Sequence, residues 1–203
     1  MKNRLRLTVL ISGAMITFVT VAAQNVEVTH ATGGSIRTPL SSSIILNSES
    51  SLTREWVAIK HQNLPVILRG TPGVVTKYDP GERYSSGKYE YTVTVEFDVA
   101  EPLVAIEIRF LTFDVWGEHV RTLNLTEIKD FKVGVNKLSG NWNIYSENET
   151  SEYYASIAYI SRVRTKDGRV ITGDATPVIA EAKKFYTKFS EADLDPEKTK
   201  PAK

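Results

Sequence analysis

Apolar and polar residues alternate with a period of two through the middle of the chain. In residues 89–99, Tyr, Val and Phe occupy every second position, and Glu, Thr and Asp occupy the positions between them. Successive side chains of a β-strand point to opposite faces, so this pattern predicts a strand with one buried and one wet face. Residues 104–113 carry apolar side chains on both faces toward their end, which is typical of a more central strand.

Turn residues separate a series of shorter strand candidates. These candidates are residues 56–60, 66–68, 74–75, 120–123, 131–133, 142–145 and 153–164. Asp167-Gly168 predicts a tight hairpin, because both central residues of a type I′ turn need a positive φ. Asp114 and Gly117 fit the first and fourth positions of a type I turn. Many short strands joined by Gly, Pro and Asp turns predict an all-β fold, an antiparallel β-sandwich.

One segment departs from the period of two. Thr176 and Pro177 are typical of a helix N-cap and a first helical residue. Apolar side chains then recur at spacings of four, three and four and form one helical stripe, made of Val178, Ala182, Phe185 and Phe189. The pattern predicts a C-terminal amphipathic helix over residues 177–189 that packs on the sandwich. The alternative is a basic helix offered to a membrane or a partner.

The first residues have the pattern of an export signal. Lys2, Arg4 and Arg6 precede an uncharged, mostly apolar run over residues 7–23 that ends in small side chains. This predicts a signal peptide over residues 1–23, cleaved before Gln24, and a periplasmic or secreted mature chain with no integral membrane span. A retained anchor is the alternative, although a membrane-spanning helix needs about 20 apolar residues.

The remaining segments divide by composition. Residues 24–52 are rich in Ser, Thr and Gly and predict a flexible leader, in which residues 44–46 form a candidate edge strand. Residues 190–203 hold two prolines and seven charges, which predicts a disordered charged tail. Residues 53–189 are then expected to form a single β-sandwich domain, including the closing helix.

Charge and cysteine content remove several functions. The chain has 25 Lys and Arg against 24 Asp and Glu, and removal of residues 1–23 leaves 22 against 24, a net charge of −2. We therefore expect no nucleic-acid partner, since such proteins carry a strong basic excess. The sequence contains no cysteine, which excludes disulfides, thiolate metal sites, thiol catalysis and an acylated lipoprotein anchor.

Groups that could carry catalysis are sparse. None of the three histidines pairs with another at the spacing of a metal-binding motif, and His30 falls in the predicted leader. The sequence has no Gly-x-Ser-x-Gly motif and no Gly-rich phosphate loop. We expect no metal, no cofactor and no catalytic residue. The alternative is an unfamiliar hydrolase with Asp114, Glu118 and His119 beside the predicted turn.

Aromatic and charged side chains supply the candidate binding residues. Trp116 stands at the tip of a predicted turn, and with Glu118 and His119 it forms the candidate ligand site, which would suit a glycan stacked on exposed rings. Trp56 and Trp142 are expected to pack in the core. Two further groups, Glu107 and Arg109, lie on one face of a central strand and are expected to pair with each other or with Arg162.

The segment from Phe110 to Gly117, Phe-Leu-Thr-Phe-Asp-Val-Trp-Gly, resembles the signature of bacterial FxLYD-type domains. Phe110, Phe113, Asp114 and Gly117 fit that pattern, with Phe113 in place of Tyr and Thr112 in place of Leu. The resemblance implies an exported immunoglobulin-like sandwich and names neither a reaction nor a ligand. We therefore expect a non-catalytic binding or assembly module at the cell envelope. Its partner would be an envelope or extracellular protein; the alternative is a carbohydrate-binding module around Trp116.

Overall fold

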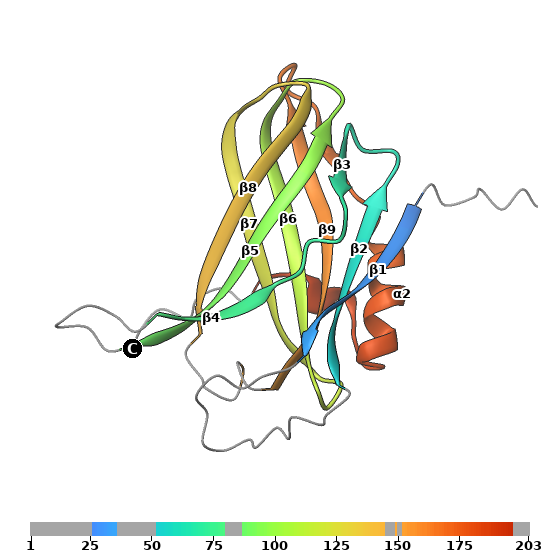
Figure 1. Cartoon of the computed structure of the whole chain (residues 1–203). Helices are drawn as coiled ribbons and strands as arrows, with labels where there is room; N and C mark the ends of the chain where they lie inside the picture. Colours follow the sequence, from blue (N-terminus) through green and yellow to red (C-terminus); the bar gives the residue numbers. More distant parts are fainter. Residues whose placement is uncertain (1–25, 36–51, 80–86, 145–148, 150–151, 197–203) are drawn as a thin grey trace, which may run out of the picture.

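The computed structural model describes residues 26–35, 52–79, 87–144, 149 and 152–196 (Figure 1). The predicted signal peptide and the edge strand predicted at residues 44–46 lie outside these residues. Two β-sheets pack face to face, and one helix covers the outer face of the larger sheet. The prediction of an all-β sandwich with a C-terminal helix is confirmed.

The larger sheet, sheet A, has the strand order β1-β2-β9-β6-β7, and the short β10 also pairs with β9. Its strands are β1 (Val26–Ser35), β2 (Thr53–His61), β6 (Leu103–Asp114), β7 (His119–Phe131), β9 (Tyr153–Thr165) and β10 (Val170–Thr172). Within the described residues every pairing is antiparallel except that of β2 with β9, where Glu55 lies opposite Ala155. The expected antiparallel sandwich is wrong at this pairing. Strands far apart in the chain need no hairpin between them, and hairpins are what impose the antiparallel direction.

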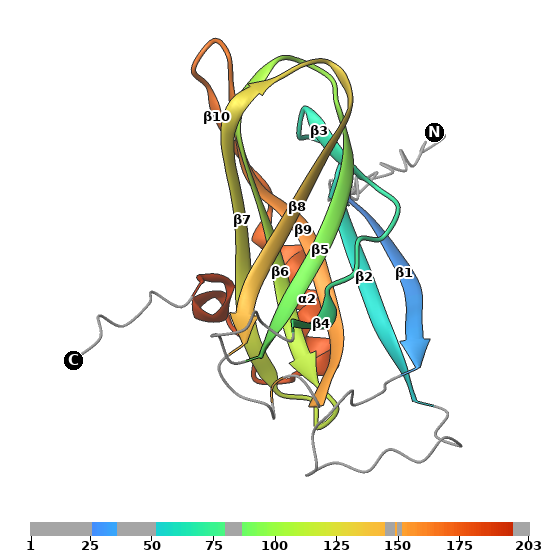
Figure 2. The same ribbon diagram turned by 60° about the vertical axis from the view of Figure 1, so that its left-hand side comes forward.

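The smaller sheet, sheet B, is built around one long strand. Its strands are β3 (Val66–Arg69), β4 (Val75–Asp79), β5 (Lys88–Val99) and β8 (Gly134–Ile144). β8 runs along one edge of β5, while β3 and β4 share the other edge. Tyr91, Val93, Val95 and Phe97 on β5 are buried, as its alternation predicts. In Figure 2, β5 and β8 lie in front of sheet A.

The core lies in two parts on either side of sheet A. Between the sheets, Val95 and Phe97 of β5 pack with Ile106, Ile108 and Phe110 of β6. On the opposite face, Leu111 and Phe113 from the C-terminal part of β6 pack with Ile157 of β9 and with two side chains of the C-terminal helix, Val178 and Ala182. This double burial explains why the end of β6 is apolar on both of its faces.

The helix α2 spans Ala175–Phe185 and lies behind sheet A in Figure 2. The predicted N-cap at Thr176 is wrong: Asp174 caps the helix, because its side chain accepts a hydrogen bond from the backbone N–H of Thr176 at 2.9 Å. The predicted helix end at residue 189 is also wrong. A turn follows Phe185, and Phe189 reaches the core from that turn with 1% of its surface exposed.

Two segments predicted to lack structure are ordered in part. The interpretation of residues 24–52 as a flexible leader is wrong for residues 26–35, because Val26 and Val28 of β1 pack against the core beneath α2. The interpretation of residues 190–203 as a disordered tail is wrong at its start. Residues Glu191–Leu194 form the 3-10 helix η1, and Leu194 is 6% exposed against the same core. Leu194 supplies the apolar contact of this short segment with the core.

Candidate functional site

The turn between β6 and β7 is held by the carboxylate of Asp114. Oδ1 of Asp114 accepts hydrogen bonds from the backbone N–H groups of Trp116 at 3.0 Å and Glu118 at 2.8 Å. Gly117 has a φ of +78° and its ideal Cβ would lie 2.9 Å from the carbonyl oxygen of Phe185, so the position favours glycine. The turn is thereby fixed against the C-terminal end of α2.

The structure distributes the three predicted ligand residues over different surroundings. Trp116 is 73% exposed at the tip of the turn, and within the described part of the chain it stacks on no second ring. Glu118 is exposed beside it. Nε2 of His119 lies 3.1 Å from the hydroxyl of Thr122, and its ring packs against Phe189 at 5.1 Å between centroids. Trp116 thus lies at the surface, whereas His119 helps to hold the segment after α2.

A pocket of about 320 Å³ lies beside this turn, and we call it the turn pocket. Its walls come from β1, β2, β9, the β6–β7 turn and the end of α2, through His30, Glu55, Asp114, Val115, Gly117, Tyr154, Lys184 and Phe185. Asp114 is the only member of the predicted Asp114, Glu118 and His119 group among these lining residues. The residues on either side of Trp116 both line the pocket, so Trp116 stands at its rim.

The polar groups of the turn pocket are linked in pairs. Tyr154 donates a hydrogen bond to Oε1 of Glu55. Burial, the hydrogen bond to Glu55 and the charge of that carboxylate together raise the pKa of Tyr154 to about 12, with burial the largest cause. Lys184 pairs with Oε1 of Glu181 at 2.5 Å, while Oε2 of Glu181 is buried without a hydrogen-bond donor and lies 3.8 Å from Nε2 of His30.

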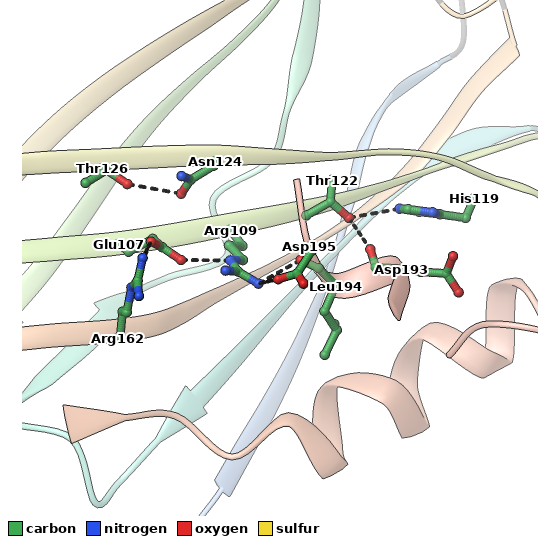
Figure 3. Close-up of polar contacts among 10 residues, drawn as sticks. All are labelled: Glu107, Arg109, His119, Thr122, Asn124, Thr126, Arg162, Asp193, Leu194 and Asp195. Carbon is green, nitrogen blue, oxygen red and sulfur yellow. Dashed lines mark hydrogen bonds and ion pairs between the residues drawn. The ribbon is translucent and has the colours of Figure 1, made fainter. Parts of the chain in front are cut away.

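A second polar group lies on the outer face of sheet A, beyond the helix (Figure 3). Glu107 is 3% exposed and accepts hydrogen bonds from Nε of Arg109 at 2.8 Å and Nη2 of Arg162 at 2.6 Å. Burial alone would raise the pKa of Glu107, but the hydrogen bonds from Arg162 and the charge of Arg109 outweigh it and lower the pKa. Glu107 was expected to pair with Arg109 or with a cross-strand neighbour such as Arg162, and it pairs with both.

The same group holds the segment that follows α2. Nη1 of Arg109 donates to the carbonyl oxygen of Leu194 at 2.8 Å and approaches Oδ1 of Asp195 at 3.3 Å (Figure 3). The hydroxyl of Thr122 on β7 donates to the carbonyl oxygen of Asp193 at 2.6 Å. These bonds give polar partners to the backbone of η1, which otherwise offers carbonyls without an intrahelical donor. Arg109 therefore has a structural role in docking the chain end.

Next to Glu107 the outer face of sheet A forms a shallow groove of about 240 Å³, which we call the arginine-rimmed groove. Its lining residues come from β6, β7, β9 and β10, and are Ala105, Ile106, Glu107, Thr126, Ile128, Arg162, Val163, Arg164 and Val170. Strand register places Ile128 opposite Ala105, Ala105 opposite Arg164, and Arg164 opposite Val170, so one row crosses four strands. Ile128 is 81% and Val170 58% exposed.

The groove was not predicted, although one signal for it is present. Ile128 lies between Thr126 and Asp130 on the solvent-facing side of β7, where the alternation of the strand favours a polar residue. The exposed partner positions on β9 and β10 belong to a different hairpin, and only the register of the sheet brings them together. The turn pocket escaped prediction for the same reason, since Glu55 and Tyr154 come from two strands of distant sequence.

The predicted roles of the other tryptophans agree with their positions only in part, since both are half-buried. Trp142 packs edge-on against Phe110 at 5.9 Å between ring centroids, and its indole N–H donates to the carbonyl oxygen of Asn124 at 3.3 Å. The ring of Trp56 occupies the space beside Gly73, where an added Cβ would overlap it. Both rings support the sandwich.

The described residues contain no group of three or more His, Cys, Asp or Glu side chains arranged to hold a metal ion. Within the same residues, no helix has both the length and the apolar character needed to cross a membrane.

Comparison with known proteins adds one distant similarity. No protein-family model matches the sequence, and no curated protein matches it. Among solved structures the chain is similar to a hypothetical protein of Peptoclostridium difficile 630, with 10% identity and a TM-score of 0.44. The match covers 66% of this chain and 97% of that chain. A similarity this low assigns neither a family nor a function, and the resemblance to FxLYD-type domains stays a prediction.

Proposed function

We propose that this protein is an exported, non-catalytic binding module of the cell envelope, and that it contacts a partner protein through the arginine-rimmed groove. The observation that carries the proposal is the exposure of two apolar side chains, Ile128 and Val170, at the two ends of a cross-strand row that also contains Arg164. The export signal predicted over residues 1–23 supports the envelope location.

The apolar part of the groove provides the driving force for association. At 81% exposure, Ile128 is the most exposed large apolar side chain in the described residues. Burial of such a side chain in an interface contributes roughly 1.5–3 kcal/mol to the free energy of association. Apolar side chains that line one shallow depression are more typical of an interaction site than scattered ones.

The charged part of the groove indicates the chemistry of the partner. Arg164 lines the groove and makes no ion pair with any described residue. Arg162 is 59% exposed in its side chain, although it contacts Glu107. A guanidinium group pairs with carboxylates in a two-pronged geometry. The partner is therefore a protein segment that presents apolar and acidic side chains in alternation, as an extended strand does.

Site-specific photo-crosslinking in the cells that make the protein tests this function. A photoreactive residue in place of Ile128 should give a defined crosslinked product, and one in place of Val135, which is 58% exposed on sheet B, should not. Arg164→Glu should abolish the product, whereas Arg69→Glu, a matched reversal on sheet B, should leave it intact. Equal crosslinking from both sheets, or none from Ile128, would overturn the proposal.

A further inference from the structure

The turn pocket carries negative charge that no described cation balances. Glu55 and Asp114 both line it, and neither carboxylate forms an ion pair within the described residues. Lys184 also lines the pocket, but its ammonium group is bound to Glu181 at 2.5 Å. The C-terminal end of α2 reaches the pocket through Phe185 and adds the partial negative charge of a helix C-terminus.

A buried carboxylate oxygen behind this wall also lacks a hydrogen-bond donor. Glu181 is 8% exposed, and its Oε2 has no donor among the described residues. The two basic side chains nearest to the Glu181 carboxylate both line the turn pocket. Nε2 of His30 lies 3.8 Å from Oε2, and the ammonium group of Lys184 binds Oε1. A buried acceptor without a donor is costly, and it is usually found where water, an ion or a ligand completes the site.

The remaining walls of the turn pocket are aromatic. Tyr154 and Phe185 pack edge to face with their ring centroids 6.4 Å apart, and Trp116 stands at the rim with 73% of its surface exposed. Aromatic faces attract organic cations through their quadrupole, and they cover the aliphatic stem that carries the charge. Aromatic walls and carboxylates that form no ion pair with a described residue favour the same ligand class when they line one pocket.

We propose that the turn pocket binds an organic cation, an ammonium or guanidinium group carried on an aliphatic stem, as in a lysine or arginine side chain. Glu55 and Asp114 supply the opposing charge, and Tyr154 and Phe185, which line the pocket, flank the stem. Trp116, at the rim, is available to cover the stem from outside. The pocket lies at the opposite end of β6 from the arginine-rimmed groove, so this inference does not depend on the proposed function. A glycan, which exposed Trp116 alone would also suit, becomes one outcome of the test.

Two-dimensional amide NMR of the folded chain tests the inference with small probes. N-acetyl-lysine-N-methylamide should shift the backbone signals of Val115 and Gly117 and the indole signal of Trp116, with a Kd of about 1 mM as expected for a small ligand at an open site. N-acetyl-norleucine-N-methylamide, which keeps the stem and lacks the charge, should bind at least about tenfold more weakly. n-Butylamine separates the two sources of the cation: tighter binding of the lysine probe assigns the site to a protein side chain, and equal binding assigns it to a small amine.

Matched variants locate the charge. Glu55→Gln, in the pocket wall, should weaken binding of the lysine probe about tenfold. Glu118→Gln removes the same charge from an exposed position of the β6–β7 turn that does not line the pocket, and it should change binding less than about twofold. Native dispersion of the spectra shows that both variants fold. The inference is overturned if the norleucine probe binds as well as the lysine probe, if neither shifts these signals, or if only an oligosaccharide such as cellohexaose does so.

Discussion

Replacement of Glu107 by alanine is expected to destabilise the protein through the arginine that it leaves behind. The Glu107 side chain is 4% exposed and that of Arg109 14% exposed, so the remaining guanidinium stays inside the structure without its carboxylate. Removing one partner from a buried ion pair costs about 3–5 kcal/mol. Arg109 keeps the carbonyl of Leu194 and the carboxylate of Asp195 as partners, so we expect the lower end, about 3 kcal/mol.

Two matched replacements separate the charge effect from lost packing. Arg162→Ala should cost at most about 1 kcal/mol, because the Arg162 side chain is 59% exposed and water replaces much of what the pair provides. The double replacement of Glu107 by Leu and Arg109 by Met should recover most of the loss from Glu107→Ala, since it leaves no buried charge. Urea unfolding followed by tryptophan fluorescence measures all of these, and urea is preferred to a salt denaturant because it does not screen charge.

Acid supplies an independent check on the same carboxylate. The pKa of Glu107 is lowered in the folded state from its ordinary value of 4.5. The contribution of Glu107 to the free energy of unfolding is therefore fully present above pH 4.5, and it is lost as the pH falls through the lower folded pKa. The difference between the native protein and Glu107→Gln should therefore shrink over that range. A free-energy change below about 1 kcal/mol for Glu107→Ala at neutral pH, or an equal loss from Arg162→Ala, would refute the reasoning.

Three further outcomes are expected. Burial lowers the pKa of His61 below 6.5 despite its bond to the carbonyl of Asp174, so the unfolded chain takes up the proton first. Stability is full above pH 6.5 and should fall as the pH drops below it, and His61→Gln should flatten this slope in urea titrations between about pH 7.5 and 5. Phe189→Ala should cost about 3–5 kcal/mol in urea unfolding and release η1 to proteolysis, whereas Lys188→Ala, at an exposed position, should change neither. Expression with residues 1–23 in a bacterium should yield a periplasmic protein whose N-terminus, by mass spectrometry, is Gln24.

Local alternation identifies the strands that bury one face, and β5 is the clearest example. Its apolar residues face the core, and Thr94, Glu96 and Asp98 between them are exposed. Glu90, near the start of the strand, departs from the pattern because it is only 9% exposed. β1 carries the same signal over only a few residues, and the small and polar residues after it obscure the strand. Its order comes from pairing with β2 and from contact with the helix-side core, and neither can be recognised from the segment alone.

The candidate sites were less accessible to sequence reasoning than the fold. The Glu107, Arg109 and Arg162 group was predictable, because residues two apart on a central strand share a face and seek charge partners across it. Trp116 was correctly placed at an exposed turn. The two sites that include Glu55, Tyr154 and Ile128 could not be predicted, because strand order brings their residues together. Strand order depends on contacts between distant parts of the chain, which local patterns do not reveal.

The parallel pairing of β2 with β9 also constrains the order of folding. Residue 55 pairs with residue 155, and β9 separates β2 from β6 in the middle of sheet A. Sheet A therefore cannot close until the chain has been made as far as β9, and such long-range contacts slow folding. Until β9 has been made, β2 lacks its parallel neighbour and the middle of sheet A cannot form. A polypeptide that must pass through a narrow translocation channel before it folds gains time from this arrangement.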